Sequence, residues 1–269
     1  MKRSGIVTLL TDFGLTDPYV AMMKGVILSI NPRARIVDIS HHIRAGSILH
    51  GSTLIRETYP YFPEGTVHVA VVDPGVGSER RVIGLETDGH LFVGPDNGIF
   101  WPVIEGNRDR KIFSLTEEKY FLPHVTGTFH GREIFAPVAA HLSLGVDLEK
   151  IGEEIEDPME LSSPAPYIRD NILHGQVLRI DNFGNLITNI RGDDLKDYLK
   201  NLNPIIQIGN LRIEKVDKIY SEVEKGEPLA IINSSELLEV AVNLGRASEY
   251  VGMDRREIIG SAVHVKRVG

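Results

Sequence analysis

Carboxylate, guanidinium and imidazole side chains that could act on water occur in two segments of the first half of the sequence. In VVDPGVGSERR at 71–81, an apolar run ends on Asp73, and Arg80 follows after a loop with two glycines; His130 stands immediately before a helix-like segment. Glycines permit close backbone approach, and a guanidinium can hold an anion or a polarised water beside a carboxylate. An imidazole before a helix can face a crevice. Asp73 with Arg80 beside it, and separately His130, are therefore candidates for chemistry.

Aspartates at the ends of predicted strands form a second pattern. Asp12, Asp38 and Asp73 each end an apolar, β-branched run. In open α/β sheets the ligand crevice lies at the carboxyl ends of the strands, so we expect these three carboxylates along one rim. The alternative, in which each aspartate only caps a turn or a helix N-terminus, stays open at this point.

Several familiar sites do not fit the sequence. TDFG at 11–14 has no accompanying kinase glycine loop, and GVGS at 75–78 lacks the lysine of a phosphate loop. The ten histidines form no HExxH or comparable metal-ligand spacing. The absence of cysteine excludes disulfides, thiolate zinc sites and cysteine nucleophiles. Any chemistry must therefore use oxygen, imidazole or guanidinium groups.

The composition is typical of a globular protein. The chain has 269 residues, 42% apolar and 25% charged, which is long enough for one large domain or two modest ones. Its net charge of −8 disfavours nucleic acid as a partner, since nucleic-acid binders usually present a basic stripe. No stretch approaches the ~20 apolar residues that span a bilayer, and the apolar run near the N-terminus is too short for a signal core. We expect a cytoplasmic protein without a membrane partner.

Alternating periods predict an α/β first domain over residues 1–160. Strand-like runs at 5–13, 35–43 and 66–73 alternate with segments of helical period, as in a mainly parallel sheet with helices on both faces. A hairpin with Asp-Gly turn chemistry follows, and REIFAPVAAHLSLG reads as a helix ended by glycine. The predicted architecture of this domain is an α/β sandwich.

The pattern changes in the second half. An acidic, proline-containing stretch without a sustained period predicts a linker at 161–171. Short alternating runs with turn signals then predict a small β-barrel domain over residues 172–269, interrupted by one helix at DDLKDYLKNL.

A resemblance to a known family connects the two halves. The sequence resembles the S-adenosylmethionine hydroxide adenosyltransferases, relatives of the fluorinase and chlorinase enzymes. The blocks that carry the resemblance, in the same order, are LTDFG, DISH, VVDPGVGSERR, GPDNG, FHGREIFAPVAAHL, IDNFGN with TNI, and EPLAIINSSELLEVAVN. It implies hydrolysis of S-adenosylmethionine to adenosine and L-methionine by attack of water or hydroxide on the ribose C5′ carbon. It implies no metal and no cofactor, because S-adenosylmethionine is the substrate.

The resemblance assigns Asp73, Arg80 and His130 as the catalytic group that handles water. In the halogenases a tyrosine stands in place of Asp73, a threonine in place of Arg80 and a serine in place of Gly131, so this chain has the hydrolase pattern. On this interpretation Arg80 favours the anionic form of water, while Asp73 and His130 accept its hydrogen bonds. Which group finally takes the proton stays open.

The same resemblance implies a set of substrate-binding residues. Asp12 would accept hydrogen bonds from the ribose hydroxyls, Phe183 would stack on adenine with Tyr220 as a weaker candidate, and Asn185 would pair with the purine edge. The remaining expected contacts are Phe129 beside His130, Asp181 and Glu239 at the methionine ammonium, Ser234 at its carboxylate, and the backbone near Val242 at the purine. Phe183 as a core anchor, Glu239 as a solvated strand residue and DNFGN as a plain hairpin turn are the structural alternatives.

The resemblance also implies a homotrimer whose sites lie between subunits, and it leaves open whether the product adenosine stays bound. Two other classes of function remain. A non-catalytic adenosine or S-adenosylmethionine sensor would need no Asp73, Arg80 and His130 arrangement. A metal-dependent phosphoester hydrolase would use the strand-end acids with His41 or His42, and would be sensitive to chelators.

Overall fold

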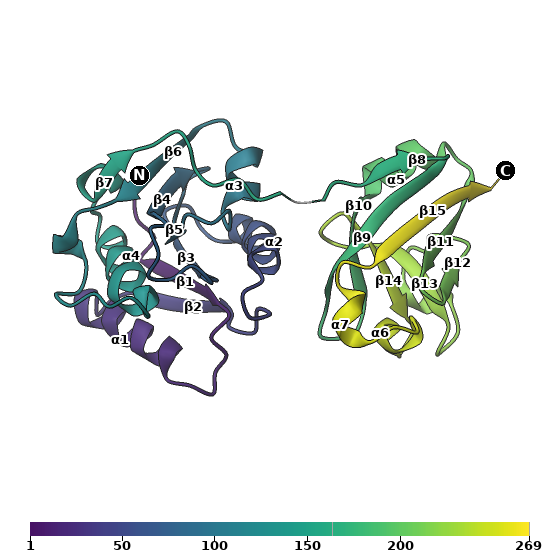
Figure 1. Ribbon diagram of the computed structural model, residues 1–269, viewed down its shortest axis with the longest axis horizontal. Helices are drawn as coiled ribbons and strands as arrows, with labels where there is room; N and C mark the ends of the chain where they lie inside the picture. The colour runs from purple at the N-terminus through teal and green to yellow at the C-terminus, as the bar shows by residue number, and fades with distance from the viewer. Residues whose placement is uncertain (163, 269) are drawn as a thin grey trace. The chain divides into compact units, whose positions relative to one another are not determined.

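The computed structural model describes residues 1–162 and 164–268, so Ser163 in the predicted linker and Gly269 at the end of the predicted second domain lie outside the described residues. The chain forms two compact units, Met1–Ser162 and Ser163–Gly269, and each is described by itself (Figure 1). Within 1–162 and 164–268, no helix is both long enough and apolar enough to cross a bilayer.

The first unit is built on a seven-stranded sheet in the order β2-β1-β3-β5-β4-β6-β7. Its strands are β1 (Ile6–Thr11), β2 (Arg35–Ser40), β3 (Val67–Val71), β4 (Val82–Thr87), β5 (His90–Pro95), β6 (Arg110–Leu115) and β7 (Gly152–Glu154). The pairs β2–β1, β1–β3 and β3–β5 are parallel, and the other three pairs are antiparallel. Only β4 and β7 therefore oppose the common direction, and the predicted mainly parallel α/β sheet is confirmed.

Helices cover both faces of this sheet (Figure 1). The helices are α1 (Tyr19–Ile30), α2 (Ile48–Thr58), α3 (Trp101–Gly106) and α4 (Ala136–Ser143). In β1, Val7 and Leu9 belong to the buried cluster that includes α1 and α4 residues, whereas Leu10 belongs to the cluster that includes α2 and α3 residues. Alternate side chains of a strand point to opposite faces, so a strand covered on both sides is mainly apolar, and its few buried polar side chains need hydrogen-bond partners.

A chain of buried polar side chains crosses the face under α2. Thr8 Oγ1 lies 2.8 Å from His68 Nδ1, and His68 Nε2 lies 3.2 Å from His90 Nδ1. Both imidazoles are buried and pack edge-on against Tyr59. Burial and the neighbouring His90 lower the pKa of His68 to about 3. Burial also lowers the pKa of His90, so both rings are neutral at pH 7. The hydrogen bonds satisfy both nitrogens of His68 and Nδ1 of His90.

We expect acid to destabilise the first unit through His68. A folded-state pKa near 3 against an ordinary 6.5 means that the unfolded state binds more protons below pH 6.5, so stability is lost as the pH falls from 6.5 toward 3. Between pH 7.5 and 5 the loss is about 2 kcal/mol. Urea unfolding followed by fluorescence of Trp101, the single tryptophan, measures it. His68→Gln should remove this part of the pH dependence, and the matched change at exposed His42 should not.

Part of the segment predicted as a linker is a strand. Tyr167–Arg169 form β8, which pairs antiparallel with β9. Asp170 and Asn171, with φ of 50° and 58°, make the two-residue turn between them. Such turns need positive φ at both central residues, which Asp and Asn tolerate. The Asp-Asn pair was the sequence signal for this hairpin.

The second unit is an antiparallel, barrel-like sheet in the order β12-β11-β15-β9-β10-β14-β13, with β8 beside β9 (Figure 1). Its strands and helices are β9 (Ile172–Ile180), β10 (Leu186–Arg191), α5 (Gly192–Leu199), β11 (Asn203–Ile208), β12 (Leu211–Ile213), β13 (Pro228–Ile232), β14 (Leu237–Val242), α6 (Ala247–Tyr250), α7 (Arg255–Ile258) and β15 (Ala262–Val268). A bridge between Asp217 and Ile231, with Asp217 N donating to Ala230 O at 2.7 Å, brings the two ends together. The predicted small barrel is confirmed.

Candidate active site

Asp73 and Arg80 form a nearly buried ion pair just beyond the carboxyl end of β3. Arg80 Nε donates to both carboxylate oxygens, at 2.8 and 2.9 Å, and an Arg80 Nη donates to Asp73 Oδ2. The Arg80 side chain is 9% exposed and the Asp73 side chain 5%. The guanidinium also lies over the Phe135 ring, 5.5 Å from its centroid. Charge-assisted, bidentate contacts of this kind are strong and fix both planes.

The same guanidinium contacts His130, with Arg80 Nη2 lying 2.8 Å from His130 Nδ1. Arginine has only donors, so Nδ1 accepts, and a neutral ring then carries its proton on Nε2. Burial and the Arg80 charge lower the pKa of His130, against weaker opposing effects of Asp73 and Glu133. Arg80 therefore bridges a carboxylate and a neutral imidazole, and the three predicted catalytic residues lie together.

A close backbone approach explains how Arg80 reaches His130 from another loop. Gly77 has a φ of 77°, and a Cβ at this position would lie 2.2 Å from the Gly127 carbonyl oxygen. The loop after β3 therefore packs directly on the segment that leads to His130. Only glycine combines this backbone conformation with this contact. Any larger residue at 77 would push the two loops, and with them Arg80 and His130, apart.

A cavity of about 390 Å³ adjoins this group in the first unit. Its lining residues are Phe13, Tyr19, Met22, Val71, Asp73, Val76, Thr128, Phe129, His130, Gly131 and Arg132. Three of the rings, Phe13, Tyr19 and Phe129, contact one another edge to face with centroids 5.2 to 6.0 Å apart. The cavity thus combines an aromatic wall with the Asp73 carboxylate and the His130 ring.

The other strand-end acids lie outside the cavity lining. Asp12 follows β1, the neighbour of β3, and its Oδ2 accepts a 2.8 Å hydrogen bond from Gly46 N. Asp38 lies inside β2, opposite Leu9, so the prediction that it ends a strand is wrong. Its carboxylate pairs with Lys24 at 2.6 Å and with His41 at 3.1 Å. Because β2 is an edge strand, a charged residue within it reaches solvent and a partner on α1.

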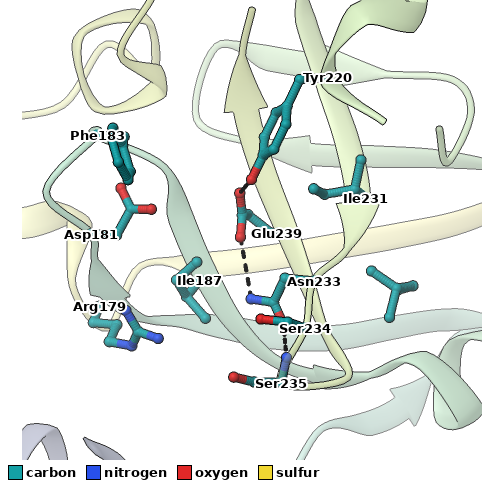
Figure 2. Close-up of a pocket in the computed structure, with 11 residues that line it drawn as sticks. Arg179, Asp181, Phe183, Ile187, Tyr220, Ile231, Asn233, Ser234, Ser235 and Glu239 are labelled. Atoms are coloured by element: carbon teal, nitrogen blue, oxygen red, sulfur yellow. Dashed lines mark hydrogen bonds between the residues drawn. The ribbon is translucent and has the colours of Figure 1, made fainter. Parts of the chain in front are cut away.

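A second cavity, of about 440 Å³, lies in the second unit, lined by residues of β9, β10, β13 and β14 and of the turns beside them (Figure 2). Its lining residues are Arg179, Asp181, Phe183, Ile187, Tyr220, Ile231, Ile232, Asn233, Ser234, Ser235 and Glu239. Figure 2 shows Asp181 and Phe183 on one side of the cavity and Tyr220 with Glu239 on the other. Five of the predicted substrate-binding residues therefore line one cavity.

The lining of this cavity includes a buried carboxylate. Glu239, 4% exposed, accepts from Tyr220 Oη at 2.6 Å and from Asn233 Nδ2 at 3.2 Å (Figure 2). Burial raises the pKa of Tyr220, and its hydrogen bond to Glu239 raises it further, so the phenol remains a donor. The hydrogen bonds hold the carboxylate in place, and a carboxylate can accept more than two.

The β9–β10 hairpin positions the other wall. Asp181 accepts from Asn185 N at 2.8 Å and from Asn185 Nδ2 at 3.1 Å, which braces the turn. Phe183, at the tip of this turn, is 73% exposed. Asn185 itself is buried and, like buried Val242 on β14, is outside the cavity lining. Exposed Ser234 lies on the lining.

Sequence reasoning missed several lining residues. In the first unit these include the aromatic residues Phe13 and Tyr19, which follow β1 and begin α1, together with Arg132. In the second unit they include Arg179 and Asn233. The signal for Phe13 and Tyr19 was two aromatic rings close to a predicted strand end, where side chains face a crevice rather than the core.

Comparison with known families matches both units. The family model described as the SAM hydroxide adenosyltransferase N-terminal domain matches residues 7–152, and the model of the corresponding C-terminal domain matches residues 175–259.

Curated and solved proteins agree with these matches. A Thermus thermophilus protein named (R)-S-adenosyl-L-methionine hydrolase is 38% identical over 92% of this chain and 95% of its own. A Methanocaldococcus jannaschii protein of the same name is 38% identical over 93% of this chain and 92% of its own. The crystal structure of an uncharacterized conserved protein from Thermotoga maritima is similar with a TM-score of 0.89 and 34% identity, covering 97% of this chain and all of that one.

Proposed function

The chain belongs to the SAM hydroxide adenosyltransferase family, and we propose that it hydrolyses S-adenosylmethionine to adenosine and L-methionine. Water oxygen forms a bond to the ribose C5′ carbon, the C5′–sulfur bond breaks, its electron pair stays on sulfur, and one water proton is released. The observation that carries the proposal is the Arg80 guanidinium shared by Asp73 and His130 beside an aromatic cavity.

The residue types fit the demands of this reaction. A sulfonium leaves as neutral methionine, so no general acid is required. The protein must hold a poorly solvated oxygen nucleophile in line with the C5′–sulfur bond. Asp73 accepts three hydrogen bonds from Arg80, and a carboxylate has about four acceptor positions, which leaves room for a water O–H.

We propose a role for His130 other than accepting a hydrogen bond from water. Its Nδ1 already accepts from Arg80, so it is not available to accept from water. We assign His130 to holding Arg80 in place, with Nε2–H as a donor. Asp73 is then the acceptor that directs the water.

The second cavity suits the rest of the substrate. We assign adenine to the exposed face of Phe183, the methionine ammonium to Asp181 and Glu239, and the methionine carboxylate to Ser234. Tyr220 borders the same space. Asp12 is assigned to the ribose hydroxyls; a carboxylate that accepts one hydrogen bond from Gly46 N can accept others.

Asn185 and Val242 lie outside the lining of the second cavity, so we assign their roles separately. Asn185 Nδ2 donates to Asp181, so we assign it to holding the hairpin. The Val242 carbonyl accepts from Gly245 N at 3.0 Å, and we assign the backbone near Val242 to the purine, because a carbonyl oxygen can accept a second hydrogen bond.

Three further features are part of the proposal. The reaction needs no metal or other cofactor, because the sulfonium is already activated. The active form is a homotrimer, in which the first cavity of one subunit and the second cavity of its neighbour serve one substrate molecule. We also assign the protein to the cytoplasm.

Hydrolysis in ¹⁸O-labelled water with a chelator present tests the function. We expect ¹⁸O in the 5′-hydroxyl of adenosine, equal amounts of adenosine and methionine, and no loss of rate with chelator; mass spectrometry measures all three. Tight binding of S-adenosylmethionine without products would instead indicate a sensor. A rate abolished by chelator and restored by a divalent metal would favour a metal-dependent hydrolase.

A further inference from the structure

Glu133 is a fully buried carboxylate for which the reaction has no direct use. It is 0% exposed and belongs to the π-helical turn Gly131–Phe135, which starts immediately after His130. A π-turn inside a helix is rare and occurs often at functional sites. A buried charge is costly unless it is paired and hydrogen-bonded. The contacts of Glu133 therefore indicate what its burial achieves.

The Glu133 carboxylate holds the segment that precedes His130. Its Oε2 accepts from Thr126 N at 2.7 Å, and Thr126 Oγ1 lies 3.1 and 3.0 Å from its two oxygens. Burial raises the pKa of Glu133, but the hydrogen bonds from Thr126 and Arg132 outweigh burial, so the net pKa is lowered and the group is ionised. Residue 127 follows directly, and its carbonyl is the group against which Gly77 packs.

The same carboxylate holds the other side of His130. It pairs with Arg132, whose guanidinium lies over the Phe129 ring, 5.0 Å from its centroid. Phe129 and Arg132 both line the first cavity. One buried charge thus fixes the residues on both sides of His130 along the chain.

We infer that Glu133 is a positioning residue: by holding Thr126 and Arg132 it sets where His130 meets Arg80 and where Phe129 faces the substrate. This inference rests on the proposed function. The Arg80–His130 contact joins two loops that are held together by the Gly77–Gly127 approach. Without the Glu133 contacts the 126–129 segment could move away from Gly77. Arg80 would then lose its contact with His130 and retain only its pair with Asp73.

Glu133→Gln tests the inference while preserving shape. The amide NH₂ of Gln would face a hydrogen-bond donor of Thr126 or Arg132, so one of the present hydrogen bonds would be lost. A misplacement of a catalytic group by about 1 Å can lower the rate ~10²-fold, and Gln permits a smaller shift. We therefore expect kcat to fall about tenfold and KM to change less than about threefold. Thr126→Val should lower kcat about threefold, and Thr126→Ser, which keeps the hydroxyl, should restore it.

The pKa of His130 in Glu133→Gln distinguishes a loss of positioning from the loss of the Glu133 charge alone. Burial and Arg80 lower the pKa of His130, whereas Asp73, Glu133 and a hydrogen bond to the Thr126 backbone raise it. Removing only the Glu133 charge would therefore lower the pKa of His130. Release of the segment withdraws Arg80 and admits water, so in Glu133→Gln we expect ¹⁵N NMR of the ring to show a higher pKa and a mixture of tautomers.

A matched control identifies a purely structural effect. Ser143, at the other end of α4, is buried and accepts from the buried Asn31 Nδ2 at 2.9 Å. Ser143→Ala should lower the melting temperature without changing kcat. Unchanged kcat in Glu133→Gln, or a lowered His130 pKa, would overturn the inference. Absence of adenosine with the unmodified protein would instead overturn the proposed function, and the NMR result would still decide the geometry.

Discussion

Replacing Asp73 by asparagine should lower kcat about 10³-fold while the protein still binds its substrate. The expected size follows from the range of about 10² to 10⁴ for a positioned group that directs or accepts a proton in the transition state. An amide keeps the shape of the side chain, but its NH₂ would face the Arg80 donors, and its remaining oxygen is a weak acceptor for water. Single-turnover assays of adenosine release measure the effect.

The folding cost of this change must be separated from its chemical cost. The Asp73–Arg80 pair is almost buried, and breaking a buried pair from one side costs about 3–5 kcal/mol because the other charge remains. Asp96→Asn is the matched control. The Asp96 side chain is 4% exposed and pairs at 2.7 Å with Arg81, which directly follows Arg80 in the sequence. Asp96 is outside the lining of the first cavity.

We expect Asp96→Asn to lower stability without lowering kcat per folded molecule. Equal losses of kcat in the two variants would reduce Asp73 to a structural residue. A loss confined to Asp73→Asn would support its role in directing water. Retention of full kcat in Asp73→Asn would contradict the assignment outright.

The fold was predictable from sequence where one period dominates. The apolar runs at β1 and β3 are buried on both faces, so composition alone identifies them as central strands. The small barrel was predictable from short alternating runs with turn residues. Asp38 was misplaced because an edge strand tolerates an acid inside it, and local sequence does not reveal which strand is at the edge. β8 was missed because three exposed residues carry no apolar period, and only the Asp-Asn turn indicates it.

The candidate site was predictable in its residue types but not in its contacts. Asp73 and Arg80 share one segment, and His130 was included through its place before a helix and through family resemblance. The tautomer of His130 follows only from the Arg80 contact, which joins residues 50 positions apart. Glu133 gave no signal, because an acid in the first turn of a helix ordinarily faces solvent and favours the helix dipole. Burial, a tertiary property, distinguishes it.

Replacing Phe183 by alanine should raise KM about 30-fold and change kcat less than about threefold. Stacking of a base on an aromatic side chain is worth about 1–3 kcal/mol, and it acts on the ground state and the transition state alike because adenine does not react. Phe183 is 73% exposed, so its removal leaves the folded barrel almost unchanged. Steady-state kinetics, with adenosine affinity from calorimetry, measures the effect.

The turn that carries Phe183 makes this a specific test of stacking. Asp181 and Asn185 hold the hairpin through their own hydrogen bonds, so the backbone keeps its place when the ring is removed. Phe183→Trp should restore affinity, and Tyr61→Ala, which removes an 83% exposed ring from the first unit, should have no effect. An unchanged KM in Phe183→Ala would mean that adenine lies elsewhere. A fall in kcat of Phe183→Ala as large as the rise in KM would mean that the ring positions the ribose for attack rather than only holding the base.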